Sequence, residues 1–144
     1  MFTYAEIEKA LAFALQIRPE ERPAFAARLR HLRNLGIPEA KPGSGKRIWY
    51  AMEDAHQMLV ALLLESLACS PRSAVSAAER YKKHYPARTD LMVVLPPGDV
   101  IPATVERLLS LARVKPVLAV LNLRCAFSGL EAALSNQTAA GGRT

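Results

Sequence analysis

Residues 28–61, RLRHLRNLGIPEAKPGSGKRIWYAMEDAHQMLVA, bring together the segments that decide the fold. An arginine-rich stretch with leucines at helical spacing comes first, and Gly36 follows it as a helix-terminating residue. A turn rich in glycine and proline comes next, followed by a short aromatic run that ends at Tyr50. From Met52 onward a strongly apolar segment has the composition of a buried helix. The order therefore predicts a helix, a hairpin and a second helix.

A pair of helices is predicted before the turn. Thr3 and Glu6 have the spacing of a capping box, which places the start of the first helix there and its end near Gln16. The second helix covers residues 20–35 and ends at Gly36. Its apolar face consists of Phe25, Leu29 and Leu32. Its opposite face carries Ala27, Arg30, His31 and Asn34, and the apolar stripe is flanked by Arg28 and Arg33.

Positive charge is concentrated around this second helix. The chain of 144 residues has a formal net charge of +6. Most of that charge comes from the basic residues Arg18, Arg22, Arg28, Arg30, Arg33, Lys41, Lys46 and Arg47. The acids in the same stretch are Glu20, Glu21 and Glu39. A concentrated basic surface can bind polyanions, whereas scattered charge only keeps a protein in solution, so the pattern favours a nucleic-acid partner. A solvated helix face without a ligand is the alternative.

Residues 37–50 have the composition of a β-hairpin, here called the wing. Pro38 and Pro42 disfavour a helix, and the sequence after Pro42 is typical of a turn. Residues 47–50 predict a short strand, and Trp49 and Tyr50 are expected to pack onto the core. Glycines at the turn let the backbone approach a phosphate closely. The wing therefore predicts a contact with a nucleic-acid backbone, and a solvated hairpin is the alternative.

The turn resembles a nucleotide-binding phosphate loop only superficially. That motif needs a glycine at position 40, where this chain has Ala40, and a serine or threonine at position 47, where it has Arg47. No cofactor is expected. The three histidines lie too far apart in sequence, and without a set of cysteines and acids around them, to predict a metal site. No catalytic triad can be identified, and the adjacent acids Glu53 and Asp54 stand at an expected helix start, where they complement the helix dipole, so an enzyme is not expected.

The C-terminal part of the chain changes character. Residues 52–68 and 70–85 predict further helices, and a mixture of short elements follows. Buried strands are expected at residues 91–95 and 117–121, helices at 104–113 and 126–134, and a fraying tail from 136 onward. A pair of strands makes a poor sheet for one chain, which suggests that a second copy supplies more strands. The fold class predicted is mainly α with a small β component (α+β). Residues 1–68 would form a winged helix-turn-helix DNA-binding domain, and residues 69–144 a C-terminal helix and strand region for dimerisation or interaction.

The cysteines, Cys69 and Cys125, stand in apolar surroundings and are expected to be buried and reduced. The N-terminus lacks the pattern of a signal peptide, and the longest apolar run is too short to span a bilayer. The expected location is the cytoplasm, in association with the nucleoid, and no membrane partner is expected.

The order of elements resembles that of the MerR-type winged helix-turn-helix regulators. The resemblance covers about the first 65 residues and rests on Leu29 to Ile37, on Gly43 to Tyr50 and on Glu53-Asp54-Ala55. The chain departs from the family in the long connection between its first two helices and in lacking the long coiled-coil helix and metal-ligand cysteines. The resemblance implies DNA binding and transcriptional regulation, but no effector. A weaker similarity links the chain to small regulators of phage or prophage type.

The sequence thus predicts a homodimeric regulator that binds specific double-stranded DNA. Arg30, His31 and Asn34 are expected nearest the base edges, because arginine and asparagine can bond to guanine and adenine edges through paired hydrogen bonds. Arg28 and Arg33 are expected at phosphate or base. The flanking backbone would be held by the wing residues Lys41, Ser44, Lys46 and Arg47. The alternative is an adaptor whose basic face contacts RNA polymerase or another acidic protein.

Overall fold

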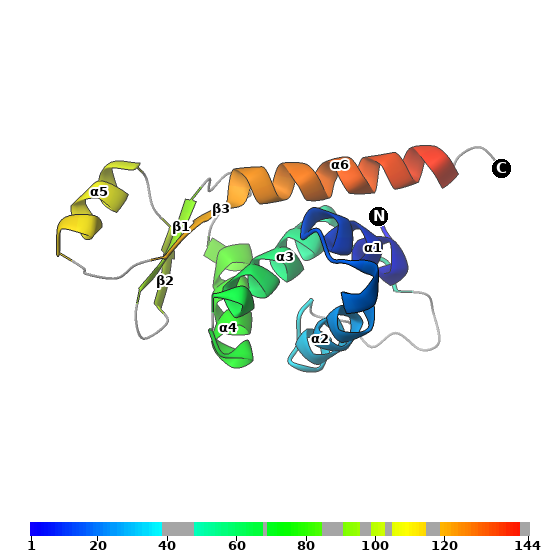
Figure 1. Ribbon diagram of the computed structural model, residues 1–144, viewed down its shortest axis with the longest axis horizontal. Coiled ribbons are helices and arrows are strands. Elements are labelled where there is room, and N and C mark those ends of the chain that lie inside the picture. Colours follow the sequence, from blue (N-terminus) through cyan, green and yellow to red (C-terminus); the bar gives the residue numbers. More distant parts are fainter. Residues whose placement is uncertain are drawn as a thin grey trace.

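The chain is mainly helical, with a small antiparallel sheet, as the sequence predicts (Figure 1). The computed structural model describes residues 1–38, 48–67, 69–84, 91–95, 99–102, 105–114 and 119–141. The helices are α1 (Tyr4–Ala14), the short 3-10 helix η1 (Pro19–Glu21), α2 (Arg22–Asn34), α3 (Met52–Ser66), α4 (Pro71–His84), α5 (Val105–Val114) and α6 (Leu123–Gly141). The strands are β1 (Leu91–Leu95), β2 (Asp99–Pro102) and β3 (Ala119–Asn122).

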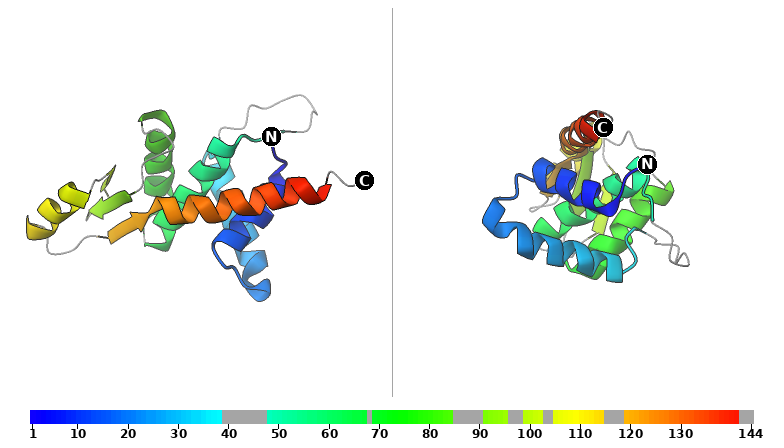
Figure 2. Two further views of the ribbon diagram at one scale, coloured as in Figure 1. Left: turned by 90° about the horizontal axis from the view of Figure 1, so that it is seen from above. Right: turned by 90° about the vertical axis from the view of Figure 1, so that its right-hand side faces the viewer.

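One hydrophobic core unites α1 to α4 with α6. Helix α3 runs through its centre, and every residue from Ala55 to Leu62 is buried. Helix α6 lies along α1 and α3, so the end of the chain covers its beginning (Figures 1 and 2). Leu130 and Leu134 of α6 are fully buried there. The core is therefore shared by both halves of the sequence, since α4 and α6 pack on the helices of the first half.

The ends of the first helices share one hydrogen-bond pattern, the Schellman motif. At the end of α1 the Ile17 amide donates to the Ala12 carbonyl at 2.8 Å, and at the end of α2 the Ile37 amide donates to Leu32 at 3.1 Å. The motif needs a residue in the left-handed region just past the helix. Gly36 fills that position after α2 with a φ of 101°, as the sequence predicts, whereas Gln16 fills it after α1 with a φ of 53°.

A buried histidine connects α3 to α6. The ring of His56 stacks on Phe127 with centroids 4.2 Å apart, and its Nε2 lies 3.0 Å from Oε1 of Glu131. Burial lowers the pKa of His56, and the nearby carboxylates of Glu131 and Glu53 oppose that shift only in part. The imidazole is therefore neutral at neutral pH and behaves as a core side chain.

The sheet lies beyond the ends of α4 and α6, with α5 farther out again (Figures 1 and 2). Its strand order is β2-β1-β3, and both pairings are antiparallel. Val93 of the central strand pairs with Ile101 on one side and with Val120 on the other. The sequence predicts β1 and most of β3 but misses β2. Since a single chain supplies a three-stranded sheet, the shortage of strands no longer argues for a second copy.

Other local expectations are also corrected. Helix α6 runs from Leu123 to Gly141, so most of the tail expected to fray is helical. The strand expected at residues 47–50 is reduced, in its described part, to one antiparallel bridge between Tyr50 and Phe2. Tyr50 is buried as expected, but Trp49 is half exposed. Both cysteines are free thiols, but Cys125 is exposed and Cys69 is half-buried.

Candidate nucleic-acid interface

The rotation of α2 about its own axis is fixed by its apolar face. Phe25, Leu29 and Leu32 are buried in the core, as the sequence predicts. The predicted outer face is also correct, because its members Ala27, Arg30, His31 and Asn34 are all exposed. This outer face is the candidate interface, and its polar side chains can donate and accept hydrogen bonds in directions that lead away from the protein.

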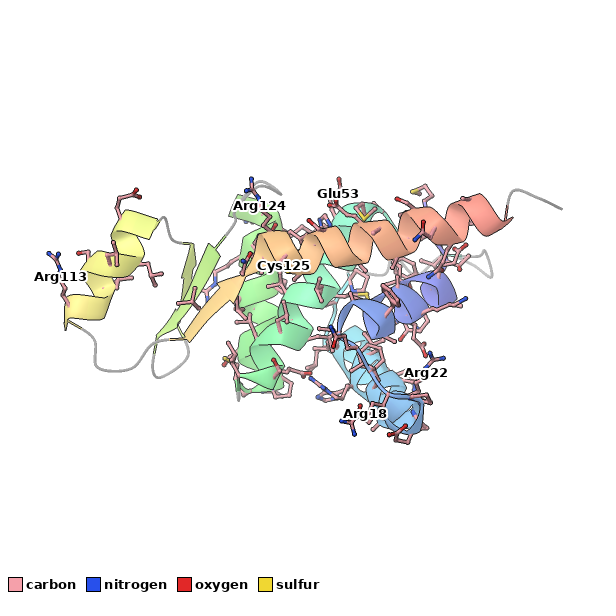
Figure 3. The ribbon with its side chains drawn as sticks, turned by 45° about the horizontal axis from the view of Figure 1, so that its top comes forward. Arg18, Arg22, Glu53, Arg113, Arg124 and Cys125 are labelled. Atoms are coloured by element: carbon pink, nitrogen blue, oxygen red, sulfur yellow. The ribbon has the colours of Figure 1, made fainter. Side chains whose placement is uncertain are left out.

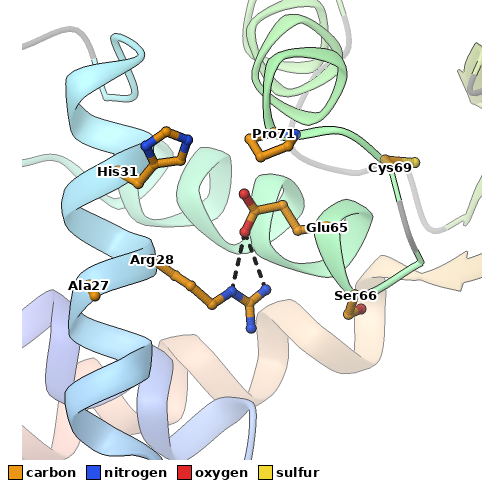
Figure 4. A pocket seen from close by; sticks show the side chains of 7 residues that line it. All are labelled: Ala27, Arg28, His31, Glu65, Ser66, Cys69 and Pro71. Atoms are coloured by element: carbon orange, nitrogen blue, oxygen red, sulfur yellow. Dashed lines mark hydrogen bonds and ion pairs between the residues drawn. The ribbon is translucent and has the colours of Figure 1, made fainter.

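Arg28, on one flank of this face, is held by an acid of another helix. Its Nε and Nη2 donate to Oε2 of Glu65 at 3.3 and 3.2 Å (Figure 4). The Glu65 side chain is only 10% exposed, against 45% for Arg28. Glu65 lies in the last turn of α3, where the helix dipole disfavours a negative charge. Arg28 compensates that charge and thereby fixes α2 to α3.

Arg33, on the opposite flank, is held by an aromatic ring of α1. Its guanidinium carbon lies 4.4 Å from the centroid of the Tyr4 ring, which is the geometry of a cation–π contact. Burial, chiefly, and then the charge of Glu8 raise the pKa of Tyr4, although Arg33 acts against this shift. The phenol is therefore neutral, and the contact joins α2 to α1.

Among the residues that the structure describes, Arg30 has no such anchor in another helix. Its Nε donates to the Ala26 carbonyl one turn earlier at 3.3 Å, so the guanidinium follows its own helix. The two other donors of the outer face, His31 and Asn34, are exposed on the following turn. Of the five helix residues predicted to contact DNA, the structure thus brings Arg30, His31 and Asn34 together on an exposed surface.

The predicted wing contacts, Lys41, Ser44, Lys46 and Arg47, lie outside the described residues. The described ends of the wing are both anchored. Before it, Ile37 is fully buried behind the α2 cap. After it, Tyr50 exchanges backbone hydrogen bonds of 2.8 and 2.9 Å with Phe2. The chain therefore leaves and rejoins the core at fixed points beside α2 and α1.

An open cleft lies beside the outer face, between α2 and the junction of α3 with α4 (Figure 4). Its volume is about 540 Å³, and it is lined by Ala27, Arg28, His31, Glu65, Ser66, Cys69 and Pro71. Burial raises the pKa of the Cys69 thiol, which keeps it protonated and a poor nucleophile. The described lining of the cleft thus has an ion pair at its centre and a thiol of low reactivity. Sequence reasoning misses it, because residues 28 and 65 meet only through the packing of α2 on α3.

Two further arginines extend the positive surface at the start of α2. Arg18 and Arg22 are exposed, and Figure 3 shows them at the end of the molecule where η1 leads into α2. The charge count of the sequence includes both, but the predicted contact residues do not. The Glu21 carboxylate lies close to them in the chain, where it accepts a hydrogen bond from the Arg18 backbone amide at 3.0 Å.

No protein-family model, no curated protein and no solved structure matches this chain. Among the described residues, no group of three or more His, Cys, Asp or Glu side chains is placed to bind a metal ion. In the same part of the chain, no helix combines the length and apolarity needed to cross a bilayer.

Proposed function

We propose that this chain is a sequence-specific double-stranded DNA-binding transcriptional regulator with a MerR-like winged helix-turn-helix. The observation that carries the proposal is the exposed outer face of α2, with Arg30, His31 and Asn34 side by side. In this reading α2 enters the major groove and these side chains meet base edges. A helix that presents an exposed arginine and an exposed asparagine on one face is suited to that role.

For Arg28 and Arg33 we propose a different role from the DNA contact that the sequence suggests. Both guanidinium groups have protein partners, Glu65 and the Tyr4 ring, on opposite flanks of α2. A helix that reads bases must be held at one rotation, because a turn of a few tens of degrees would move its donors away from the base edges. The two flanking contacts reinforce the rotation that the buried apolar face of α2 sets. We therefore assign Arg28 and Arg33 to positioning α2 and not to contacting DNA.

The wing would hold the backbone that flanks the groove, through Lys41, Ser44, Lys46 and Arg47. The fixed ends of the wing, at Ile37 and at the Phe2–Tyr50 bridge, support this part of the proposal. A homodimer would place two such units on one operator, since a twofold protein axis matches a palindromic site. The regulator would then resemble small phage or prophage repressors or activators.

The proposal is tested by selecting bound duplexes from a random DNA pool with the purified full chain. Enrichment of one motif is the expected result. Arg30→Ala should then weaken binding to that motif by about 1–3 kcal/mol and relax its sequence preference. Arg80→Ala, at an exposed position of α4, is the matched control and should leave the affinity unchanged. Failure to enrich any motif refutes the proposal and favours an acidic protein as the partner of this face.

A further inference from the structure

The exposed side of α5 carries a self-complementary pattern. Four residues of this side are exposed: Glu106, Leu109, Ser110 and Arg113. The last three follow Glu106 by three, four and seven residues, which puts all four on one face of the helix. Leu109 has 60% of its surface exposed, so apolar area lies at the middle of this face. The acid stands near the N-terminal end of this face, the base near the C-terminal end, and the leucine lies between them.

This face is accessible to a partner. Helix α5 stands at one end of the molecule, beyond the sheet and away from α2, in each of two perpendicular views (Figures 1 and 2). Figure 3 shows Arg113 pointing away from the molecule at that end. A partner bound here would leave the outer face of α2 uncovered.

The pattern fits a second copy of the same helix. Seven residues of helix rise about 10 Å, so Glu106 and Arg113 of one chain are too far apart along the helix to form an ion pair. When two copies of α5 lie antiparallel about a twofold axis near Leu109, each Glu106 faces the other copy's Arg113. The two leucines then meet at the centre. An isologous contact of this kind needs one self-complementary patch, which this face provides.

We propose that α5 is a contact between two copies of this chain, with Leu109 packed at its centre and two Glu106–Arg113 ion pairs around it. The inference rests on the dimer part of the proposed function and is independent of DNA. One ten-residue helix buries less surface than a standard stable interface, so the free protein should associate weakly and at high concentration.

The test measures association of the full chain by sedimentation velocity over a concentration series without DNA. The wild type should dimerise reversibly. Glu106→Arg and Arg113→Glu should each weaken self-association about tenfold or more, because each places like charges opposite one another. An equimolar mixture of the two variants should recover wild-type association, since one chain then offers two bases and the other two acids. Recovery on mixing would show that the pairing is between chains.

Glu79→Arg, at an exposed position of α4, is the matched charge control and should associate like the wild type. Leu109→Ser should weaken association without changing any charge. A wild type that stays monomeric at every concentration, or a mixture no more associated than its separate variants, overturns the proposal. Because no DNA is present, either result leaves the assignment of α2 to be judged by its own selection experiment.

Discussion

The guanidinium carbon of Arg33 lies 4.4 Å from the centroid of the Tyr4 ring, so α2 is tied to α1 by a contact between a charge and an aromatic face. On its other flank, Arg28 ties α2 to α3 through Glu65. The helix with the candidate base-reading residues is thus held from two sides by side chains that a sequence reading assigns to DNA.

The Arg33–Tyr4 contact can be measured by a double-mutant cycle on the free energy of unfolding. Arg33→Gln removes the cation and Tyr4→Leu removes the ring, and the double variant removes both. We expect a coupling of about 0.5–1 kcal/mol, typical of a partly exposed cation–π pair. The control is Arg30→Gln combined with Tyr4→Leu, for which the coupling should be absent. Equal coupling in both cycles would show that Tyr4 has no specific interaction with Arg33.

The Arg28–Glu65 pair distinguishes positioning from direct DNA contact. If Arg28 positions α2, Arg28→Gln and Glu65→Gln should both weaken operator binding while the dependence of affinity on salt stays unchanged. Exchange of the charges, in Arg28→Glu combined with Glu65→Arg, should recover much of the affinity. If Arg28 touches phosphate instead, its loss should lower the salt slope by about one. In that case Glu65→Gln should strengthen binding, because it releases the arginine.

Local signals account for much of what the sequence predicts correctly. The Thr3–Glu6 capping box forms as expected, with the Glu6 carboxylate accepting from the Thr3 amide at 2.6 Å. The face of α2 that turns inward follows from three apolar residues at helical spacing. Both signals lie within a few residues of the structure that they determine, so a single sequence is enough to read them.

The features that the sequence misses depend on distant parts of the chain. Glu65 is 37 residues from Arg28, and only the crossing of α2 and α3 brings them together. Strand β2 ends in Pro102, which argues against a central strand but is tolerated at the edge of a sheet. Helix α6 extends past residue 134 through small and polar residues whose helicity is supported by the packing of its earlier turns on α1.

The left-handed cap at the end of α2 predicts that alanine substitutions at two different glycines change the stability of the protein in opposite directions. Gly36 has a φ of 101° and open space where a Cβ would lie, so Gly36→Ala should cost about 1–2 kcal/mol from backbone strain alone. Gly129 lies within α6, and its added Cβ would meet the Ala14 Cβ at an ordinary 4.0 Å. Gly129→Ala should therefore stabilise by roughly 0.5–1 kcal/mol, as helix propensity predicts. Urea unfolding measures both, and equal effects would contradict the assignment of Gly36 as a left-handed cap.

At the equivalent position after α1, a substitution that introduces glycine is expected to stabilise the protein. Gln16 occupies the left-handed region, with a φ of 53°, at the same point of the same motif. Gln16→Gly should relieve the strain and stabilise the protein by up to about 1 kcal/mol, reduced by the greater backbone freedom of glycine when unfolded. Gln16→Ala keeps the strain and is the control, so it should not stabilise. If Gln16→Gly is less stable than the wild type, the glutamine side chain stabilises the folded protein by more than the backbone strain destabilises it.

Buried His56 predicts that the protein loses stability in mild acid. Its pKa in the folded protein lies below the ordinary value of 6.5, so the unfolded chain binds more protons in the pH range between those values. Its contribution to stability is fully present above pH 6.5 and is lost as the pH falls from there toward the folded pKa. The free energy of unfolding should therefore fall by up to about 1.4 kcal/mol for each pH unit in that window.

Urea unfolding at several pH values measures this loss. His56→Leu should flatten the dependence, because no group at position 56 then gains a proton on unfolding. His31→Asn, at an exposed position of α2, is the matched control and should keep the wild-type slope. Since His56→Leu also changes the contact with Phe127, an NMR titration of the His56 imidazole in the wild type gives a second measure. A midpoint at or above 6.5 would show that Glu131 and Glu53 outweigh burial, and stability would then not decline through this histidine.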